Sequence, residues 1–127
     1  MTRILGPDMK RRTGHRSAII NMGSYLAESR LLNAPVYSAS NSFENVFSET
    51  IGYENPDLDV LTVQSMPIKS KKNPFGVSAE DTVNGVLDDL GHERISYGHW
   101  KHSLTRYYIM ARMFWYGGPS NTFTRSW

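Results

Sequence analysis

The feature that most constrains this chain is a pair of apolar, strand-like runs with one long helical pattern between them. Residues 18–22 read Ala-Ile-Ile-Asn-Met, the length expected of a short buried strand. Residues 60–63 read Val-Leu-Thr-Val, a nearly continuous apolar run typical of a strand buried on both faces of a parallel sheet. Between the runs, apolar residues recur at the spacing of one helix face: Ala39, Phe43, Val46, Phe47 and Ile51. Strand, helix and strand in this order predict one βαβ unit with a right-handed connection.

The later part of the chain predicts a second helix and a short strand. Ser78 is expected to cap a helix that carries two acidic residues in its first turn, and Gly91 is expected to end it. The inward-facing positions of this helix are expected to be Val83, Val86, Leu87 and Leu90. Residues 94–97 are expected to form a short last strand.

The last predicted element is an aromatic and basic amphipathic helix over residues 99–115. Such a helix can dock on its own domain or on a partner, which we favour, and it can also lie in a membrane interface. Residues 117–127 are rich in Gly, Pro, Ser, Asn and Thr, and are expected to form a flexible tail.

Two hydroxyl-bearing residues stand at the junctions of the predicted βαβ unit. Ser24 follows the first strand, and Tyr37 opens the helical pattern after a loop over residues 23–36. A serine and a tyrosine placed in this way can meet over a bound substrate. A residue four places after the tyrosine lies on the same helix face, and a lysine there lowers the pKa of a phenol so that it exchanges protons near neutral pH. Here that position is Asn41, which forms hydrogen bonds but carries no charge.

These residues belong to a segment that resembles the active site of the short-chain dehydrogenase/reductases. The segment reads Asn-Met-Gly-Ser and, starting thirteen residues after Ser24, Tyr-Ser-Ala-Ser-Asn from Tyr37, whereas the family usually reads Asn-x-Ser-Ser and Tyr-x-Ala-Ser-Lys. Residues 1–14, 60–67 and 98–104 resemble further parts of the family in the same order. The last of these is similar to the branch of very-long-chain 3-ketoacyl-CoA reductases and 17β-hydroxysteroid dehydrogenases.

The resemblance covers roughly residues 1–115 and only the C-terminal half of such an enzyme. It implies an α/β, partial Rossmann-like fold: the C-terminal half of a doubly wound parallel sheet over residues 1–116, with a C-terminal amphipathic helix. It also implies that residues 1–14 contain the end of the helix before the first strand, which places Pro7 and Gly14 as local breaks.

The resemblance also implies roles for site residues and a cofactor. Tyr37 would give its proton to a substrate carbonyl oxygen, and Ser24 would hold that oxygen. Asn41 stands where the family lysine binds the nicotinamide ribose. The implied cofactor is NADP(H), and the turn at Pro67 and Ile68 would contact it, although Ile68 stands where the family has glycine.

A glycine-rich turn after a first strand, which dinucleotide binding requires, is missing from the sequence. Without that half of the fold, the strand at residues 18–22 keeps an open apolar edge, which calls for a partner. We therefore expect that the chain does not work as a lone monomer, and that a protein partner supplies the missing half-domain or that the chain sits in a larger complex.

Three hypotheses about function follow. The first is an NADPH-dependent reductase of the 3-ketoacyl-CoA or 17β-hydroxysteroid kind, whose cofactor half lies on a separate chain. The second is a non-catalytic structural or interaction subunit of a larger complex, and the third is a decayed fragment. Ser24 and Tyr37 at the family spacing favour the first, whereas Asn41 and Ile68 favour the others.

Composition excludes several other classes. A net charge of +2 is too small to indicate nucleic-acid binding, and the absence of cysteine excludes disulfides and thiolate metal sites. His99 and His102 are interpreted as structural, so no metal site is predicted. No apolar run of about 18 residues is present, so no transmembrane helix is expected.

The compartment is open to two interpretations. The family branch implies the endoplasmic reticulum membrane, with the last helix as a candidate contact to the membrane surface. The basic residues 1–16 resemble a mitochondrial presequence as an alternative, but we favour a helix end followed by a loop.

Overall fold

A computed structural model describes residues 2–11, 14–29 and 33–116 of the chain, so the predicted tail lies outside the described residues. Helices and strands alternate along the chain, as the βαβ pattern predicts. Their order is α1 (Thr2–Lys10), β1 (Ser17–Ser24), α2 (Leu26–Ser29), α3 (Pro35–Glu54), β2 (Leu58–Ser65), α4 (Ala79–Asp89), β3 (Ile95–Ser96) and α5 (Trp100–Tyr116).

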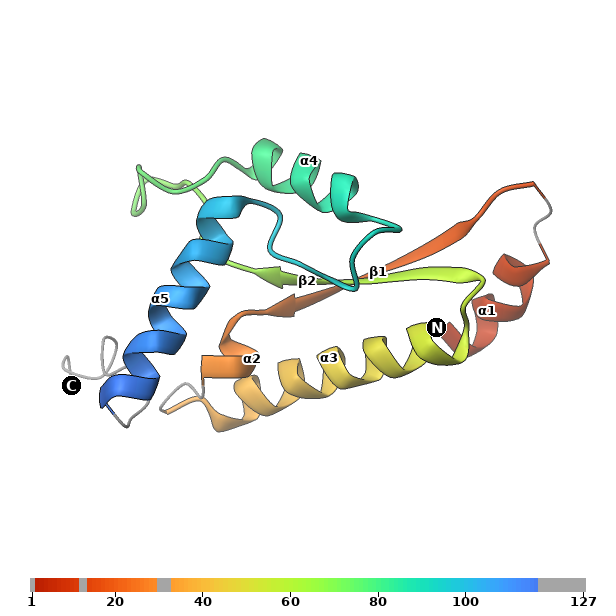
Figure 1. Cartoon of the computed structure of the whole chain (residues 1–127), viewed down its shortest axis with the longest axis horizontal. Coiled ribbons are helices and arrows are strands. Elements are labelled where there is room, and N and C mark those ends of the chain that lie inside the picture. The colour runs from red at the N-terminus through yellow and green to blue at the C-terminus, as the bar shows by residue number, and fades with distance from the viewer. Residues whose placement is uncertain (1, 12–13, 30–32, 117–127) are drawn as a thin grey trace.

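Within the described residues, a three-stranded parallel sheet runs in the order β1-β2-β3. β1 and β2 pair along their whole length, from Ser17 opposite Leu58 to Ser24 opposite Ser65. β3 pairs with β2 through two residues, Ile95 and Ser96. Figure 1 shows α3 on one face of this sheet and α4 on the other. The predicted α/β fold, a partial Rossmann-like sheet, is confirmed.

β2 is the centre of the core because it is the strand with a neighbour on each side. Its interior residues are buried on both faces, as its continuous apolar run predicted. Leu61 and Val63 form the core cluster with Val86 of α4, and Leu90 packs against this cluster. The apolar contact between α4 and the sheet is therefore concentrated on β2.

The face of α3 that meets the sheet is small and polar, and it is not the face on which the sequence places the apolar residues. The buried residues of α3 are Ser38, Ser48 and Gly52. Asn21 of β1 donates through Nδ2 to Ser48 Oγ at 2.7 Å, and a Cβ on Gly52 would lie 3.5 Å from the Val60 side chain. The helix thus approaches the strands so closely that only small side chains fit between them.

The apolar stripe that the sequence placed on α3 is mostly exposed. Phe43 is 67% exposed and Val46 64%, while Phe43 stacks on Phe47 with ring centroids 5.8 Å apart. The described residues therefore leave a large apolar surface of α3 without cover, which is unusual for a helix of a self-sufficient domain.

Three boundaries around α3 also differ from the prediction. The helix begins at Pro35 rather than Tyr37, because proline suits a first turn in which its missing N–H is not needed. It continues past Gly52, a residue whose type often ends a helix, to Glu54, so Gly52 is a packing residue inside the helix. The expected loop over residues 23–36 contains the short helix α2. A helix of four residues is too short to show a periodic pattern of apolar residues in the sequence.

The predictions for α4 are confirmed at its ends and half wrong on its inner face. Ser78 Oγ accepts a hydrogen bond from the Asp81 N–H at 3.0 Å, and Gly91 follows the C-cap with φ +84°. Val86 is buried and Leu90 packs on the core, but Val83 and Leu87 are both 54% exposed. The helix contacts the sheet through a narrower stripe than the sequence suggested.

α4 also makes one backbone approach that depends on the absence of a side chain. A Cβ on Gly85 would lie on the carbonyl group of Gly98, 2.7 Å from its carbon, and neither backbone can yield easily. Gly98 itself has φ +68°, a conformation that glycine adopts without strain.

We predict that Gly85→Ala destabilises the fold by about 1–3 kcal/mol or more, because overpacking against backbone outweighs the gain in helix propensity. Gly6→Ala is the matched control, since a Cβ added at Gly6 would meet nothing within 4 Å and α1 is also a helix. Urea unfolding of both variants measures the difference. Equal midpoints for the two variants would contradict the close approach of α4 to Gly98.

Candidate site at the carboxyl ends of the strands

Because the strands are parallel, their carboxyl ends meet at one end of the sheet, where ligands bind in open α/β folds. Ser24 and Ser65 lie opposite each other at this end, as the last residues of β1 and β2. Ser24 is buried, and its Oγ accepts a hydrogen bond from the Leu26 N–H at 3.3 Å as the chain turns into α2. A hydroxyl that accepts in this way still has its own proton to donate.

Tyr37 lies in the first turn of α3 and is 48% exposed. Its position is linked to β1 through Tyr25, the residue after Ser24. Burial raises the pKa of the Tyr25 phenol, and the nearby charge of Tyr37 raises it further. The two phenols therefore lie close enough to interact, which brings Tyr37 to the end of β1.

The short helix α2 connects the two halves of this arrangement. Ser42 of α3 donates to the Ala27 carbonyl of α2 at 2.9 Å. This bond fixes the first turns of α3 beside the residues that follow Ser24. The structure thus places both predicted hydroxyl residues at the same end of the βαβ unit.

Asn41 lies one turn after Tyr37, as predicted, but its amide is turned to its own helix. Its Nδ2 donates to the Tyr37 carbonyl at 2.8 Å. The side chain is shorter than a lysine and brings no charge toward the phenol. The predicted role of Asn41 in binding a ribose stays a prediction.

Pro67 and Ile68 follow β2 and are both exposed at the same end of the sheet. They open a loop that closes on itself, with the Lys69 N–H donating to the Val77 carbonyl at 2.7 Å. All the predicted site residues therefore lie on the segments that continue from the carboxyl ends of β1 and β2 or on the first two turns of α3.

α5 crosses the same end of the sheet, beyond the points of the β1 and β2 arrows (Figure 1). Arg106 of α5 donates through Nε and Nη2 to Glu28 Oε2 of α2, each at 2.8 Å. The Tyr97 hydroxyl, after β3, lies 3.4 Å from Glu28 Oε1, and the Arg106 guanidinium lies 5.5 Å from the Tyr97 ring centroid. We call Glu28, Tyr97 and Arg106 the α2–α5 cluster.

The α2–α5 cluster and Tyr25 were not found from the sequence. Glu28 and Arg106 are separated by 78 positions, and no motif links them. Tyr25 could have been found from the sequence, because it directly follows the predicted site residue Ser24. The cluster shows that α5 docks on its own domain, although residues such as Trp100, Tyr107 and Trp115 remain largely exposed.

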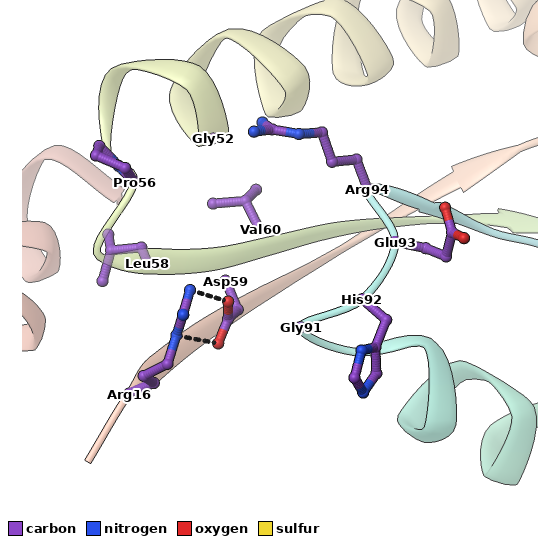
Figure 2. A pocket seen from close by; sticks show the side chains of 10 residues that line it. All are labelled: Arg16, Gly52, Pro56, Leu58, Asp59, Val60, Gly91, His92, Glu93 and Arg94. Atoms are coloured by element: carbon purple, nitrogen blue, oxygen red, sulfur yellow. Dashed lines mark hydrogen bonds and ion pairs between the residues drawn. The ribbon is translucent and has the colours of Figure 1, made fainter. Parts of the chain in front are cut away.

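A pocket lies at the amino ends of the strands, away from the predicted site residues. Figure 2 shows Arg16 paired with Asp59 across this pocket, whose volume is about 230 Å³. The two hydrogen bonds of the pair are 3.1 and 2.6 Å long. Arg94 stacks on the Tyr53 ring with 4.0 Å between guanidinium carbon and centroid. Because Arg16 is paired and Arg94 is stacked, we interpret the pocket as structural.

The sequence predicts neither a metal site nor a transmembrane helix. Among the described residues, no group of three or more His, Asp or Glu side chains could hold a metal ion. His99 Nδ1 accepts from the Lys101 N–H at 3.1 Å, and His102 Nδ1 lies 2.9 Å from the Tyr97 carbonyl oxygen. In the same described part of the chain, none of the helices has the length and apolar character needed to cross a bilayer.

Comparison with known proteins finds similarity among solved structures. No protein-family model matches the sequence, and no curated protein matches it. Among solved structures, the chain is similar to one from a study of 7β-hydroxysteroid dehydrogenase stereoselectivity, with a TM-score of 0.69 and 18% identity. The match covers 87% of this chain and 45% of the other, so the chain spans less than half of that protein. At this identity the match establishes a short-chain dehydrogenase-like fold.

The α2–α5 cluster predicts a pH dependence of stability. Burial raises the pKa of the Tyr97 phenol to about 12, and the charge of Glu28 contributes. The pKa of Tyr97 in the folded chain lies above the ordinary value of about 10. The contribution of Tyr97 to the free energy of unfolding is therefore fully present below pH 10 and is lost as pH rises toward 12. Tyr97→Phe should therefore lose less stability between pH 9 and pH 11 than the unmodified chain.

Denaturant unfolding at the two pH values measures this difference. Tyr108→Phe on α5 is the control, because Tyr108 is 66% exposed and lies outside the cluster. It should follow the unmodified chain. Parallel loss of stability in Tyr97→Phe and the unmodified chain would show that Tyr97 is not held in the cluster.

Proposed function

We propose that this chain is the carbonyl-binding half of a short-chain dehydrogenase-like oxidoreductase. The observation that carries the proposal is the placement of Ser24 and Tyr37 at one end of the βαβ unit, in a chain with the fold of a 7β-hydroxysteroid dehydrogenase. The substrate class is a ketone on an apolar body, either a 3-ketoacyl thioester or a steroid.

In this proposal Ser24 donates a hydrogen bond to the substrate carbonyl oxygen, and Tyr37 donates the proton that turns this oxygen into a hydroxyl. Tyr37 is accessible enough for this because about half of its side chain is exposed. Tyr25 is a further donor beside Tyr37, because a phenol is protonated at neutral pH at its ordinary pKa of about 10 and burial raises the pKa of Tyr25 above that value.

NADP(H), when bound, supplies the hydride in this chemistry. Pro67 and Ile68 are exposed after β2 and are open to its nicotinamide end. The Asn41 amide oxygen is the group that can accept from a ribose hydroxyl, since the amide nitrogen is engaged with the Tyr37 carbonyl. The sequence has no glycine-rich turn for the pyrophosphate, so we propose that a protein partner holds that part.

The place for this partner is the outer side of β1. Within the described residues β1 has one neighbouring strand, and its Met22 is 67% exposed. An unpaired edge with exposed apolar side chains favours a partner over an isolated monomer. We further propose contact with the endoplasmic reticulum membrane surface, for which Trp100, Tyr107 and Trp115 on α5 are exposed; a mitochondrial location is the alternative.

A non-catalytic interaction subunit is the second candidate function. It is favoured by Asn41, whose amide contacts its own helix and brings no charge to Tyr37. The exposed stripe of Phe43 and Val46 on α3 fits a subunit that packs against another chain. In this alternative the Ser24 and Tyr37 geometry is retained without chemistry.

A chimera tests the choice directly. The cofactor-binding half of a 7β-hydroxysteroid dehydrogenase would be joined in front of this chain, and NADPH oxidation measured with a ketosteroid. We expect slow turnover that Tyr37→Phe removes. Asn41→Lys should raise it on the order of a hundredfold, because two units of phenol pKa correspond to about that factor.

NADPH fluorescence provides the control for folding, since the chimera must bind cofactor before its turnover is interpreted. Phe43→Ser, on the exposed face of α3, is the matched variant that should leave turnover unchanged. A chimera that binds NADPH but shows no turnover even with Asn41→Lys would favour the interaction subunit.

A further inference from the structure

The apolar face of α5 is exposed rather than packed on the sheet. Its residues recur at helical spacing and are Trp100, Leu104, Tyr107, Tyr108, Ala111, Phe114 and Trp115, all of them exposed. The exposed fractions of the large side chains in this set run from 61% for Leu104 to 85% for Phe114. We call the set the outer face of α5.

The opposite side of α5 is the side that the domain holds. His102 is buried there, and Arg106 donates to the Glu28 carboxylate of α2. Ile109 and Met113 are half-buried on the same side. Because these contacts fix the helix, its outer face is not available to the core. A contiguous apolar surface of this kind marks an interaction site.

The charges beside the outer face are all positive. No acidic residue follows Glu93 in the sequence, so α5 carries basic charges alone. Lys101 and Arg112 are exposed and about three helical turns apart, which places them along one edge of the outer face. Neither forms an ion pair with another described residue. The Lys101 ammonium lies 5.7 Å from the Trp100 ring centroid, so charge and aromatic surface adjoin.

The loop between β2 and α4 adds charge beside the same helix. The loop has no acidic residue, and its bases are Lys69, Lys71 and Lys72. All three lysines are exposed, and none is in an ion pair with the described part of the chain. Phe75 in this loop is 94% exposed. Phe75 and Lys101 line the same pocket, so the loop lies beside the first turns of α5, at the same end of the molecule (Figure 1).

The combination of lysine with aromatic residues favours a lipid surface over a protein partner. Protein interfaces are enriched in Trp, Tyr, Phe, Met and Arg but depleted in Lys. Helices that lie in the plane of a bilayer combine Lys and Arg with Trp, Phe and Leu, and Trp and Tyr gather at the level of the lipid headgroups. Unpaired bases without an acid among them complement the negative charge of anionic lipids.

We propose that the outer face of α5 and the loop between β2 and α4 dock in the plane of a bilayer that contains anionic lipid. The inference rests on the membrane contact proposed above and adds the docking surface and the lipid class. Vesicle binding needs neither cofactor nor turnover, and Ser24 and Tyr37 are outside this surface. Its failure is therefore separate from failure of the proposed reductase function.

The test mixes the full chain with vesicles of phosphatidylcholine alone or of phosphatidylcholine with phosphatidylserine, and measures binding by flotation. We expect binding to the vesicles that contain phosphatidylserine, and we expect salt to weaken it. Replacing Lys69, Lys71 and Lys72 together by Gln should weaken this binding roughly a hundredfold, because each lysine near such a surface contributes about fivefold.

Two variants with the same change of charge locate the contact. Leu104→Glu removes an apolar side chain from the outer face and adds a charge that anionic lipid repels, so binding should fall about tenfold or more. Val46→Glu makes the same change on the exposed stripe of α3 and should bind nearly as the unmodified chain does. Leu104 is 61% exposed and Val46 64%, so neither change is expected to disturb the fold.

Three results would overturn the proposal. They are absence of binding by the unmodified chain, equal binding to both kinds of vesicle, and equal losses in Leu104→Glu and Val46→Glu. The native mass of the same samples provides a further check, because a second copy of the chain is the competing occupant. A dimer that becomes monomeric only with Leu104→Glu would assign the outer face to that second copy and would also overturn the proposal.

Discussion

The parallel pairing of β1 with β2 is the constraint on which the rest of this structure depends. It joins Ser17 to Leu58 at one end and Ser24 to Ser65 at the other, so both carboxyl ends finish together. A parallel pair needs a crossover, and α3 provides it along one face of the sheet. The first turn of α3 must therefore start near the end of β1, which brings Tyr37 toward Ser24. The site is a consequence of the topology and does not depend on any single side-chain contact.

The sequence predicted the elements whose signals are local. Continuous apolar residues identified β2. Ser78 identified the start of α4, because its capping bond joins it to Asp81, only three positions later. It failed where partners are distant. The apolar stripe on α3 did not face the sheet, because Gly52 and Ser48 allow a closer approach than bulky residues do. The ion pair of Glu28 with Arg106 spans 78 positions and could not be inferred from spacing. The site residues Ser24 and Tyr37 were predictable because their spacing follows from one βαβ unit.

The carboxyl end of the sheet gathers several hydroxyl groups, and position 41 beside them is uncharged. Ser24, Tyr25 and Tyr37 gather hydroxyl donors at the end of β1, and the α2–α5 cluster fixes α5 across the same end. Asn41 leaves this group of donors without a cation at the position where a lysine would supply one. The outer side of β1 is the surface where we place the partner that completes the site, and the exposed stripe of α3 is a separate apolar surface.

The central claim is that position 41 lies one helix turn after Tyr37, so that a charge placed there acts on the Tyr37 phenol. The most direct measurement is the ionisation of the tyrosines in the Asn41→Lys variant, followed by ring ¹³C NMR between pH 7 and pH 12. We predict that one tyrosine ionises at lower pH than in the unmodified chain, since an ammonium within about 4–6 Å favours the phenolate. That signal should vanish when Tyr37→Phe is added. Identical titration of all tyrosines in the lysine variant and the unmodified chain would contradict the claim.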